Sequence, residues 1–424
     1  MIDLNARLHV ERLGQRGEGL ARGPEGPVFI PYALADETII AEVDGSRGRL
    51  VEIVTPSPNR IDPFCRYFSV CGGCAVQTLA AAPYAQWKQS LLVVALKQAG
   101  LAATVEPLVD AHGEGRRRAT FHARVDWTGK STTGFMRARA HKIVEIDSCP
   151  VLAPAMLRAA PVARALAQAL AGSGKPLDIL VTATASGLDV DLKGHGPLSE
   201  DESRRLVRLA LTQDLARLSN HGAIVFAQRT PMLAMGRTMV APPPGAFLQA
   251  TEAGEQALAA KVCAAVKGAG EIADLFAGVG TFSLRMAEFA GIHAFDLEEA
   301  ALGALAKAAR IEGLRPVSVE ARDLFRRPLA PAELARFEAI VFDPPRAGAE
   351  QQARALAASR VPLVVAISCN AQTFARDAAI LCSGGYEIAR IEPIDQFRHS
   401  PHVEIIGVFH RPAEKSRKIR RLLG

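Results

Sequence analysis

The clearest chemical feature of the sequence is a cysteine at the end of a short apolar run. Residues 363–367 are five consecutive apolar residues, and Ser368, Cys369 and Asn370 follow directly. Such a run suits a strand buried on both faces of a parallel sheet, and ligands bind at the carboxyl ends of such strands. A thiolate in that place could act as a nucleophile. Because an unpaired cysteine is more often buried and inert, the neighbouring motifs decide between these interpretations.

A second group of cysteines has the spacing of metal ligands. Cys65-x5-Cys71-Gly-Gly-Cys74 brings three thiols close together, and Cys149 is the nearby candidate for a fourth ligand. Thiolates bind zinc or iron–sulfur clusters, and glycines let the backbone bend around them. We favour an iron–sulfur cluster, because zinc sites more often have two Cys-x2-Cys pairs and this chain has one such pair. Unligated structural cysteines are the alternative.

Acidic residues follow predicted strands in the last part of the chain, where strand and helix patterns alternate as in a doubly wound sheet. Asp274, Gly278 and Gly280 form Asp-x3-Gly-x-Gly, Asp296 ends the next strand, and Asp343 opens Asp-Pro-Pro-Arg. A glycine turn lets a ligand approach the backbone, and an acid on the next strand can bind a ribose. The turn lacks the three-glycine dinucleotide fingerprint. Asp-x-Phe-x-Gly-x-Gly is instead typical of S-adenosylmethionine-dependent methyltransferases.

The elements that must position these residues fall into three predicted domains, which 424 residues can supply. Residues 1–57 alternate short β-prone runs with turns, which predicts a small β-barrel. Residues 58–244 begin in a proline-rich linker, and 245–424 follow three consecutive prolines. We therefore expect an α/β fold, with a Rossmann-like doubly wound C-terminal domain, an N-terminal barrel and a central α+β domain bearing the cysteines. Helices are predicted near 84–100, where the helix could pack on the C-terminal domain, and over 153–170 and 199–218.

Charge and hydropathy limit the class of protein. The net charge is +6, with basic clusters at 116–118 and 415–421. Such clusters suit nucleic acid, although most basic runs are solvated surface. No segment has the roughly 20 apolar residues needed to span a bilayer, and the first ten residues carry charges where a signal peptide needs an apolar core. We therefore expect a cytoplasmic protein without a membrane partner.

Taken together, the motifs resemble the RNA uracil-5-methyltransferase family over nearly the whole chain. Residues 14–21, Gly-Gln-Arg-Gly-Glu-Gly-Leu-Ala, resemble a TRAM domain, an OB-like RNA-binding barrel found on RNA-modifying enzymes. The chain most resembles the members with this barrel and a 4Fe-4S cluster that modify 23S ribosomal RNA. The motifs that carry the resemblance are Cys71-Gly-Gly-Cys74, Gly134-Phe-Met-Arg137, His141-Lys-Ile143, Cys149-Pro-Val-Leu152, Ala246-Phe-Leu-Gln249, 274–282, 343–348, Ser368-Cys-Asn370 and His402-Val-Glu404.

The resemblance implies a reaction and roles for individual residues. The reaction is methyl transfer from S-adenosylmethionine to carbon 5 of a uridine in RNA, and we expect a monomer that binds ribosomal RNA. Cys369 would be the nucleophile and Glu404 the base. The implied ligands of the 4Fe-4S cluster are Cys65, Cys71, Cys74 and Cys149, and the implied cofactor positions are Gln249, Phe276, Thr281, Asp296, Asp323 and Asp343.

The reactivity of uracil independently requires a nucleophile and a base of these types. Carbon 5 is too weak a nucleophile to take a methyl group, so a thiolate must first add to carbon 6. Afterwards the hydrogen on carbon 5 must leave as a proton before the thiolate is expelled, which requires a base such as a carboxylate. Cys369 and Glu404 fit these roles, although an isolated glutamate is more often a surface residue. The target base is expected to flip out of its stack into a pocket above Cys369.

Departures from the family pattern leave alternatives open. Thr251 stands where Asn is common, Asp296 where Glu is common, and 398–400 read Arg-His-Ser in place of Pro-x-Thr. The shorter Asp296 concerns cofactor affinity, and the altered stretch near Glu404 concerns substrate choice. The main alternative is a transfer RNA uracil methyltransferase with the same chemistry, but the TRAM-like barrel favours ribosomal RNA. A radical methylthiotransferase is disfavoured because its clusters use Cys-x3-Cys-x2-Cys, and a non-catalytic RNA-binding protein because Cys369 and Glu404 are present.

Overall fold

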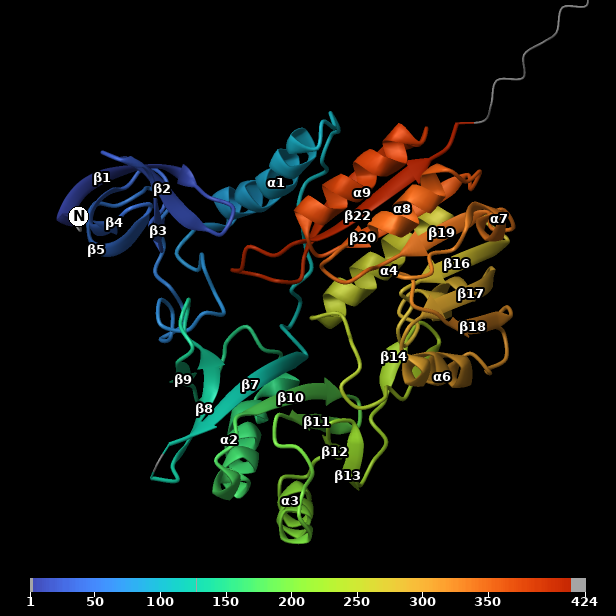
Figure 1. Cartoon of the computed structure of the whole chain (residues 1–424), viewed down its shortest axis with the longest axis horizontal. Helices are drawn as coiled ribbons and strands as arrows, with labels where there is room; N and C mark the ends of the chain where they lie inside the picture. The colour runs from blue at the N-terminus through green and yellow to red at the C-terminus, as the bar shows by residue number, and fades with distance from the viewer. Residues whose placement is uncertain (1–2, 127, 413–424) are drawn as a thin grey trace, which may run out of the picture.

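The computed structural model describes residues 3–126 and 128–412, which form a barrel and two large sheets with their helices (Figure 1). The basic cluster predicted at 415–421 lies outside the described residues. Figure 1 shows the barrel at one end of the molecule, with helix α1 (Ala81–Gln98) running from it toward the C-terminal sheet. Among the described residues, no helix is long and apolar enough to cross a membrane. The predicted α/β fold class is confirmed.

The N-terminal strands close into a five-stranded barrel in the order β1-β2-β3-β5-β4. Alternate residues point inward, and Val10, Ile30 and Ile39 are completely buried in the barrel core. Gly48 lies where two strands approach closely, since a Cβ added there would be 2.6 Å from the Ile30 side chain. The strands are β1 (Asp3–Leu13), β2 (Glu18–Gly23), β3 (Gly26–Pro31), β4 (Thr38–Asp44) and β5 (Arg47–Thr55).

The central part of the chain forms a seven-stranded sheet in the order β13-β12-β11-β10-β7-β8-β9. Apolar residues of the sheet and of helices α2 and α3 share one core. Helix α3 starts with a capping box between Ser199 and Glu202, which satisfies free backbone N–H groups. The elements are β7 (Arg118–Val125), β8 (Ser131–Met136), β9 (Ile143–Glu145), α2 (Ala159–Ala169), β10 (Leu177–Thr184), β11 (Gly187–Lys193), α3 (Glu200–Thr212), β12 (Arg217–Asn220) and β13 (Ala223–Ala227).

The helix predicted over 199–218 is wrong over residues 213–218, because α3 ends at Thr212. Asp214 has a left-handed φ of 48°, which a helix cannot continue through. Leu218 then pairs with Val190 in the parallel ladder between β12 and β11. An apolar residue at helical spacing thus belongs to a strand, because pairing with β11 outweighs local propensity.

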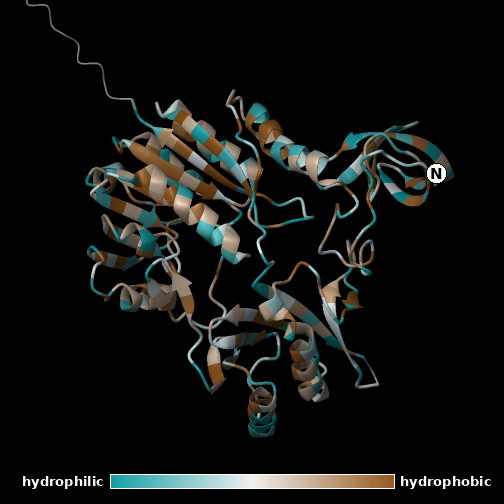
Figure 2. Cartoon of the chain, turned by 180° about the vertical axis from the view of Figure 1, so that it is seen from behind, coloured by the Kyte–Doolittle hydropathy of each residue, from teal (hydrophilic) through white to brown (hydrophobic). Residues whose placement is uncertain are grey.

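The C-terminal sheet has eight strands in the order β18-β17-β16-β19-β20-β22-β21-β6. Strands β16 to β20 are parallel, whereas β22 runs antiparallel to both β20 and β21. Figure 2 shows hydrophobic residues concentrated along these strands. The elements are β6 (Val109–Asp110), α4 (Glu252–Val266), β16 (Glu271–Leu275), α5 (Ser283–Met286), β17 (Gly291–Asp296), α6 (Glu299–Ala308), β18 (Val317–Ala321), α7 (Pro331–Leu334), β19 (Ala339–Phe342), α8 (Glu350–Ala357), β20 (Leu363–Ser368), α9 (Ala371–Ser383), β21 (Glu387–Asp395) and β22 (Glu404–His410).

Helices cover both faces of this sheet, as a doubly wound fold requires. Residues of α4, α5 and α6 share one core with the sheet, together with the small hairpin β14 (Leu233–Met235) and β15 (Thr238–Val240). Residues of α7, α8 and α9 form the core on the other face, and Leu92 and Leu96 of α1 join them. An element from the first quarter of the chain therefore packs on the C-terminal sheet, beside α9 (Figure 1).

Candidate active site

Strand ends bring the predicted catalytic residues to one edge of the C-terminal sheet. Asp343 follows β19, and Cys369 follows β20. Because β22 runs antiparallel to β20, with Ile405 opposite Ser368, its first residue Glu404 starts at the same edge. The predicted nucleophile and base therefore meet from different strands.

Cys369 is half-buried at the start of helix α9. The Asn370 side chain caps that helix by accepting hydrogen bonds from the backbone N–H groups of Gln372 and Thr373, at 2.9 and 3.3 Å. Burial, followed by the nearby carboxylates of Glu404 and Asp343, raises the pKa of the Cys369 thiol to about 11. At neutral pH this shift favours the protonated thiol, which would have to lose its proton to act as a nucleophile.

A chain of buried hydrogen bonds joins Glu404 to Asp343. The Gln396 amide donates to Glu404 Oε1 at 3.1 Å and to Gln249 Oε1 at 2.6 Å. Gln249 in turn donates to Asp343 Oδ2 at 2.9 Å. Glu404 is only 3% exposed, and its Oε2 has no hydrogen-bond partner within the described part of the chain. A free buried carboxylate oxygen is available to take a proton.

Burial shifts both carboxyl groups toward the protonated form. The pKa of Glu404 is raised above its usual range by burial and by the negative charge of Asp343, and Arg346 opposes the rise. Burial also raises the pKa of Asp343, against the hydrogen bond from Gln249. Two neighbouring acids with raised pKa values are typical of a functional centre.

The predicted cofactor residues line the same edge, around the turn after β16. Asp296 Oδ2 accepts a hydrogen bond from the Gly278 backbone N–H at 2.8 Å, which fixes its carboxylate beside the turn. Phe276 has a left-handed φ of 63°, rare for a non-glycine residue, and its ring lies 5.5 Å from that of Phe325. Asp323 accepts from the Phe325 backbone N–H at 3.0 Å. The turn, two aromatic rings and a ribose-type acid form a set of groups that suits a nucleoside.

Two further groups complete this edge. Asp274 is fully buried and accepts a hydrogen bond from Ser283 Oγ at 2.5 Å. Its Oδ1 has no partner among the described residues, and burial raises its pKa to about 7. Thr281 continues the turn, where its carbonyl accepts from Arg285 at 2.6 Å. The free Oδ1 of this buried acid can accept a further hydrogen bond.

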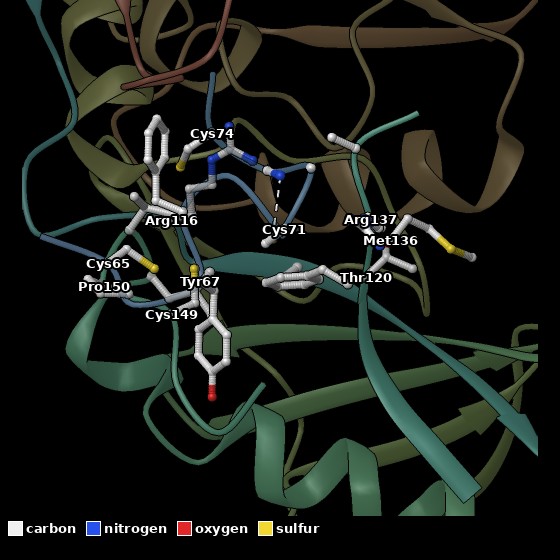
Figure 3. Close-up of a pocket in the computed structure, with 18 of the residues that line it drawn as sticks. Cys65, Tyr67, Cys71, Cys74, Arg116, Thr120, Met136, Arg137, Cys149 and Pro150 are labelled. Carbon is white, nitrogen blue, oxygen red and sulfur yellow. Dashed lines mark hydrogen bonds between the residues drawn. The ribbon is translucent and has the colours of Figure 1, made fainter. Parts of the chain in front are cut away.

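The four predicted cluster cysteines line one cavity of about 380 Å³ (Figure 3). Burial raises the pKa of Cys71 and Cys74, and that of Cys149 to about 11, and neighbouring cysteines contribute to each rise. The Gly73 backbone N–H donates to Cys71 Sγ at 3.4 Å. Within the described residues, no three His, Cys, Asp or Glu side chains are arranged to hold a single metal ion. The four cysteines nevertheless line the same cavity, and four thiols in that arrangement suit a metal cluster better than a single ion.

The cysteine segment also touches the loop that precedes Glu404. The backbone N–H groups of Ala75 and Val76 donate to the carbonyl of His399, at 2.7 and 3.2 Å. The His399 N–H in turn donates to the Tyr84 hydroxyl of α1 at 3.0 Å. The cysteine segment and α1 therefore support the loop that leads to the predicted base.

Comparison with known proteins identifies the family. A model of tRNA (Uracil-5-)-methyltransferases matches residues 236–412. An uncharacterized RNA methyltransferase of Brucella suis biovar 1 is 45% identical over 403 residues, which cover 95% of this chain and 97% of that protein. The chain belongs to the RNA uracil-5-methyltransferase family. It is an S-adenosylmethionine-dependent RNA (uracil-5-)-methyltransferase.

Two further relatives carry specific names. The 23S rRNA (uracil(1939)-C(5))-methyltransferase RlmD of Chromohalobacter salexigens is 33% identical, over 97% of this chain and 90% of that protein. The structure of the Pyrococcus abyssi tRNA (uracil-54, C5)-methyltransferase, in complex with S-adenosyl-L-homocysteine, superimposes with a TM-score of 0.71 and 21% identity. That match covers 95% of this chain and all of the other, so the two share their fold.

The basic run at 116–118 is not the solvated surface that its composition suggests. Arg117 is 7% exposed, forms an ion pair with Glu255 of α4, and donates to the Gln249 carbonyl at 3.1 Å. Arg116 lies 5.3 Å from the Phe397 ring centre, and Arg118 donates to the Leu248 carbonyl at 3.1 Å. The prediction that this cluster binds nucleic acid is therefore wrong for Arg117, which joins the start of β7 to helix α4 of the enzyme.

Sequence reasoning missed three contributors to the site. Gln396 contacts Glu404 directly, Phe325 lies against Phe276, and Lys88 of α1 is buried beneath the loop before Glu404. Gln396 stands two residues before the stretch 398–400 that departs from the family pattern, which was the available signal. Phe325 follows an acid already predicted to contact the cofactor.

Proposed function

We propose that this enzyme methylates carbon 5 of a uridine in 23S ribosomal RNA, with Cys369 as nucleophile and Glu404 as base. The observation that carries the proposal is the meeting of these two side chains at one sheet edge, where the Glu404 carboxylate acts on the pKa of the thiol. The ribosomal target is supported by 33% identity across nearly full length with a named 23S ribosomal RNA methyltransferase.

In the proposed reaction, the Cys369 thiol gives its proton to solvent and its sulfur bonds to carbon 6 of the uracil, while the electron pair of the double bond between carbons 5 and 6 moves onto carbon 5 and its conjugated carbonyl. S-adenosylmethionine supplies the methyl group to that carbon. Glu404 then takes the hydrogen of carbon 5 as a proton, the double bond re-forms, and the Cys369 sulfur leaves carbon 6. Burial of the Glu404 side chain limits the access of water to the proposed base.

We propose that the cofactor is held by Gln249, Phe276, Thr281, Asp296, Asp323 and Asp343. Asp296, fixed by the Gly278 N–H, would accept the ribose hydroxyls, and the aromatic pair Phe276 and Phe325 would contact the flat base. The acidic groups at this edge also suit the positive charge of the methyl donor.

A 4Fe-4S cluster is proposed at Cys65, Cys71, Cys74 and Cys149. The proposal is supported by the cavity of about 380 Å³ that these four cysteines line together, since in such a cluster each thiolate would bind a different iron. Because burial raises the pKa of three of these thiols, they need a positive group to be held as thiolates.

Three domains are proposed, at 1–57, 58–244 and 245–424, with the first as a TRAM-like barrel that contacts RNA. The proposed protein is a cytoplasmic monomer. Arg139 of the central part forms an ion pair with Glu18 of the barrel, which supports a fixed arrangement of these two parts around one RNA.

Transfer RNA is the second candidate substrate, favoured by the description of the matching family and by the named function of the Pyrococcus abyssi relative. The deciding experiment is RNA sequencing for 5-methyluridine in a strain lacking this gene. Loss of the mark from 23S ribosomal RNA alone supports the proposal, whereas loss from transfer RNA alone replaces it with the second candidate.

A further inference from the structure

The amide of Gln396 is completely buried, and its orientation is fixed by its partners. Its Oε1 accepts a hydrogen bond from the backbone N–H of Thr251 at 3.3 Å. A backbone N–H can only donate, so the amide oxygen must face Thr251 and the nitrogen must face the other way.

The nitrogen end of Gln396 has two hydrogens and two acceptors. One acceptor is Gln249 Oε1, at 2.6 Å, and the other is Glu404 Oε1, at 3.1 Å. Because the Gln249 oxygen accepts, its own nitrogen is left to donate to Asp343 Oδ2, at 2.9 Å. Both amides therefore donate toward a carboxylate, and the whole chain of bonds has one direction.

Within the described residues, Gln396 donates a hydrogen bond to Glu404 Oε1, and Glu404 Oε2 accepts none. The charged or titratable groups that act on Glu404 are Asp343 and Arg346, which follow β19, and Cys369, which follows β20. Burial and Asp343 favour the protonated acid, which cannot accept a proton from carbon 5. Arg346 and the Gln396 amide favour the carboxylate.

We propose that Gln396 is a positioning residue that holds Glu404 as a carboxylate, with Oε1 fixed and Oε2 free to take the proton from carbon 5. This inference rests on the proposed function, in which Glu404 is the base. In this inference Gln396 acts only through Glu404. Its hydrogen bond sets the pH range in which Glu404 is ionised and can accept the proton.

The test replaces Gln396 with methionine, which has a similar length but no hydrogen to donate. Loss of the donor raises the pKa of Glu404, so the carboxylate fraction at neutral pH falls about tenfold for each unit of rise. Proton removal should slow by about that factor at pH 7 and recover toward pH 9. Gln396→Glu adds a negative charge when ionised and provides no donor. The pH at which proton removal recovers should therefore be higher for Gln396→Glu than for Gln396→Met.

The assay uses a mixture of 23S ribosomal RNA and transfer RNA transcripts labelled with tritium on carbon 5 of uridine. Tritium release reports proton removal, and incorporation from methyl-labelled S-adenosylmethionine reports methyl transfer. Under single-turnover conditions, with enzyme in excess over RNA, slow thiol addition delays both signals, whereas slow proton removal delays tritium release alone. Methyl incorporation also shows that a variant is folded.

The matched control is Gln352→Met in α8. Gln352 is 1% exposed and its amide hydrogen-bonds both backbone groups of Leu329, away from the site. The inference is overturned if Gln396→Met releases tritium like this control at every pH, or if it slows equally at every pH, as a packing defect would. Normal tritium release by Glu404→Gln would instead refute the proposed base, whatever Gln396→Met does.

Discussion

The buried ion pair between Lys88 and Asp395 should be a main anchor of α1 on the C-terminal sheet. Lys88 is completely buried, and its Nζ lies 2.9 Å from Asp395 Oδ1. The same Nζ donates to the carbonyls of Phe397, at 3.3 Å, and His402. One cation therefore holds the end of β21 and both ends of the loop that leads to Glu404.

Replacing Lys88 with methionine keeps the aliphatic stem and removes the charge. Asp395 would keep hydrogen bonds from the Tyr84 hydroxyl, at 2.5 Å, and from the Phe397 N–H, at 3.1 Å, but would lose its cation. Breaking a buried pair from one side costs about 3–5 kcal/mol. The two carbonyls also lose their donor, so we expect the upper part of that range.

Tryptophan fluorescence can follow this change, because the chain has two tryptophans and one of them is Trp87 on α1. In a Trp127→Phe background, the urea midpoint reported by Trp87 should fall strongly for Lys88→Met. Lys97→Met, an exposed position on the same helix, should shift the free energy of unfolding by less than about 0.5 kcal/mol. Adding Asp395→Leu to Lys88→Met should restore part of the loss, because it removes the unpaired acid. Equal midpoints for Lys88→Met and Lys97→Met would refute the anchoring role.

Four other outcomes are expected. Cys369→Ala should form no covalent bond to RNA, and methylation by this variant would exclude the covalent path. Glu404→Gln should slow elimination by roughly 10² to 10⁴ and accumulate a protein–RNA adduct on denaturing gels, provided S-adenosylmethionine is present; rapid turnover would move the base elsewhere. Anaerobically purified protein should contain about four irons, and Cys149→Ala should lose them, whereas stoichiometric zinc would contradict the cluster. Arg117→Met should lower the free energy of urea unfolding by about 1.5–3 kcal/mol and leave the salt dependence of RNA affinity unchanged. A weaker salt dependence would show that Arg117 binds phosphate.

The position of Cys369 could be predicted from local sequence, because an apolar strand followed by a thiol and a helix cap follows general rules of parallel sheets. The position of Glu404 beside it could not, since it depends on β22 entering the sheet antiparallel to β20. Only the resemblance to a family supplied that residue. Strand order is set by tertiary packing and leaves little trace in the periodicity of a single strand.

Buried polar groups were the least predictable part of the site. Arg117 belongs to a run of three arginines that reads as surface charge, and its partner Glu255 lies 138 residues further along the chain. Gln396 reads as an ordinary polar residue until Gln249 and Thr251 are brought against it from the segment before α4. Composition cannot separate such residues from solvated ones, because the difference lies in partners that only the fold brings together.

The placement of β22 between β20 and β21 has a consequence for how the enzyme is made. Strand β21 and its neighbour β6 connect to the rest of the sheet through β22, which is the last strand of the described chain. During synthesis, the sheet must therefore stay open at β20 until residues 404–410 have emerged, with an unpaired apolar edge next to Cys369. We expect the nucleophile and the base to become ordered in a single late folding event, so that a nascent chain with Cys369 already synthesised has no competent centre. Pulse-labelled hydrogen exchange during refolding should show the amides of β20, β21 and β22 gaining protection together.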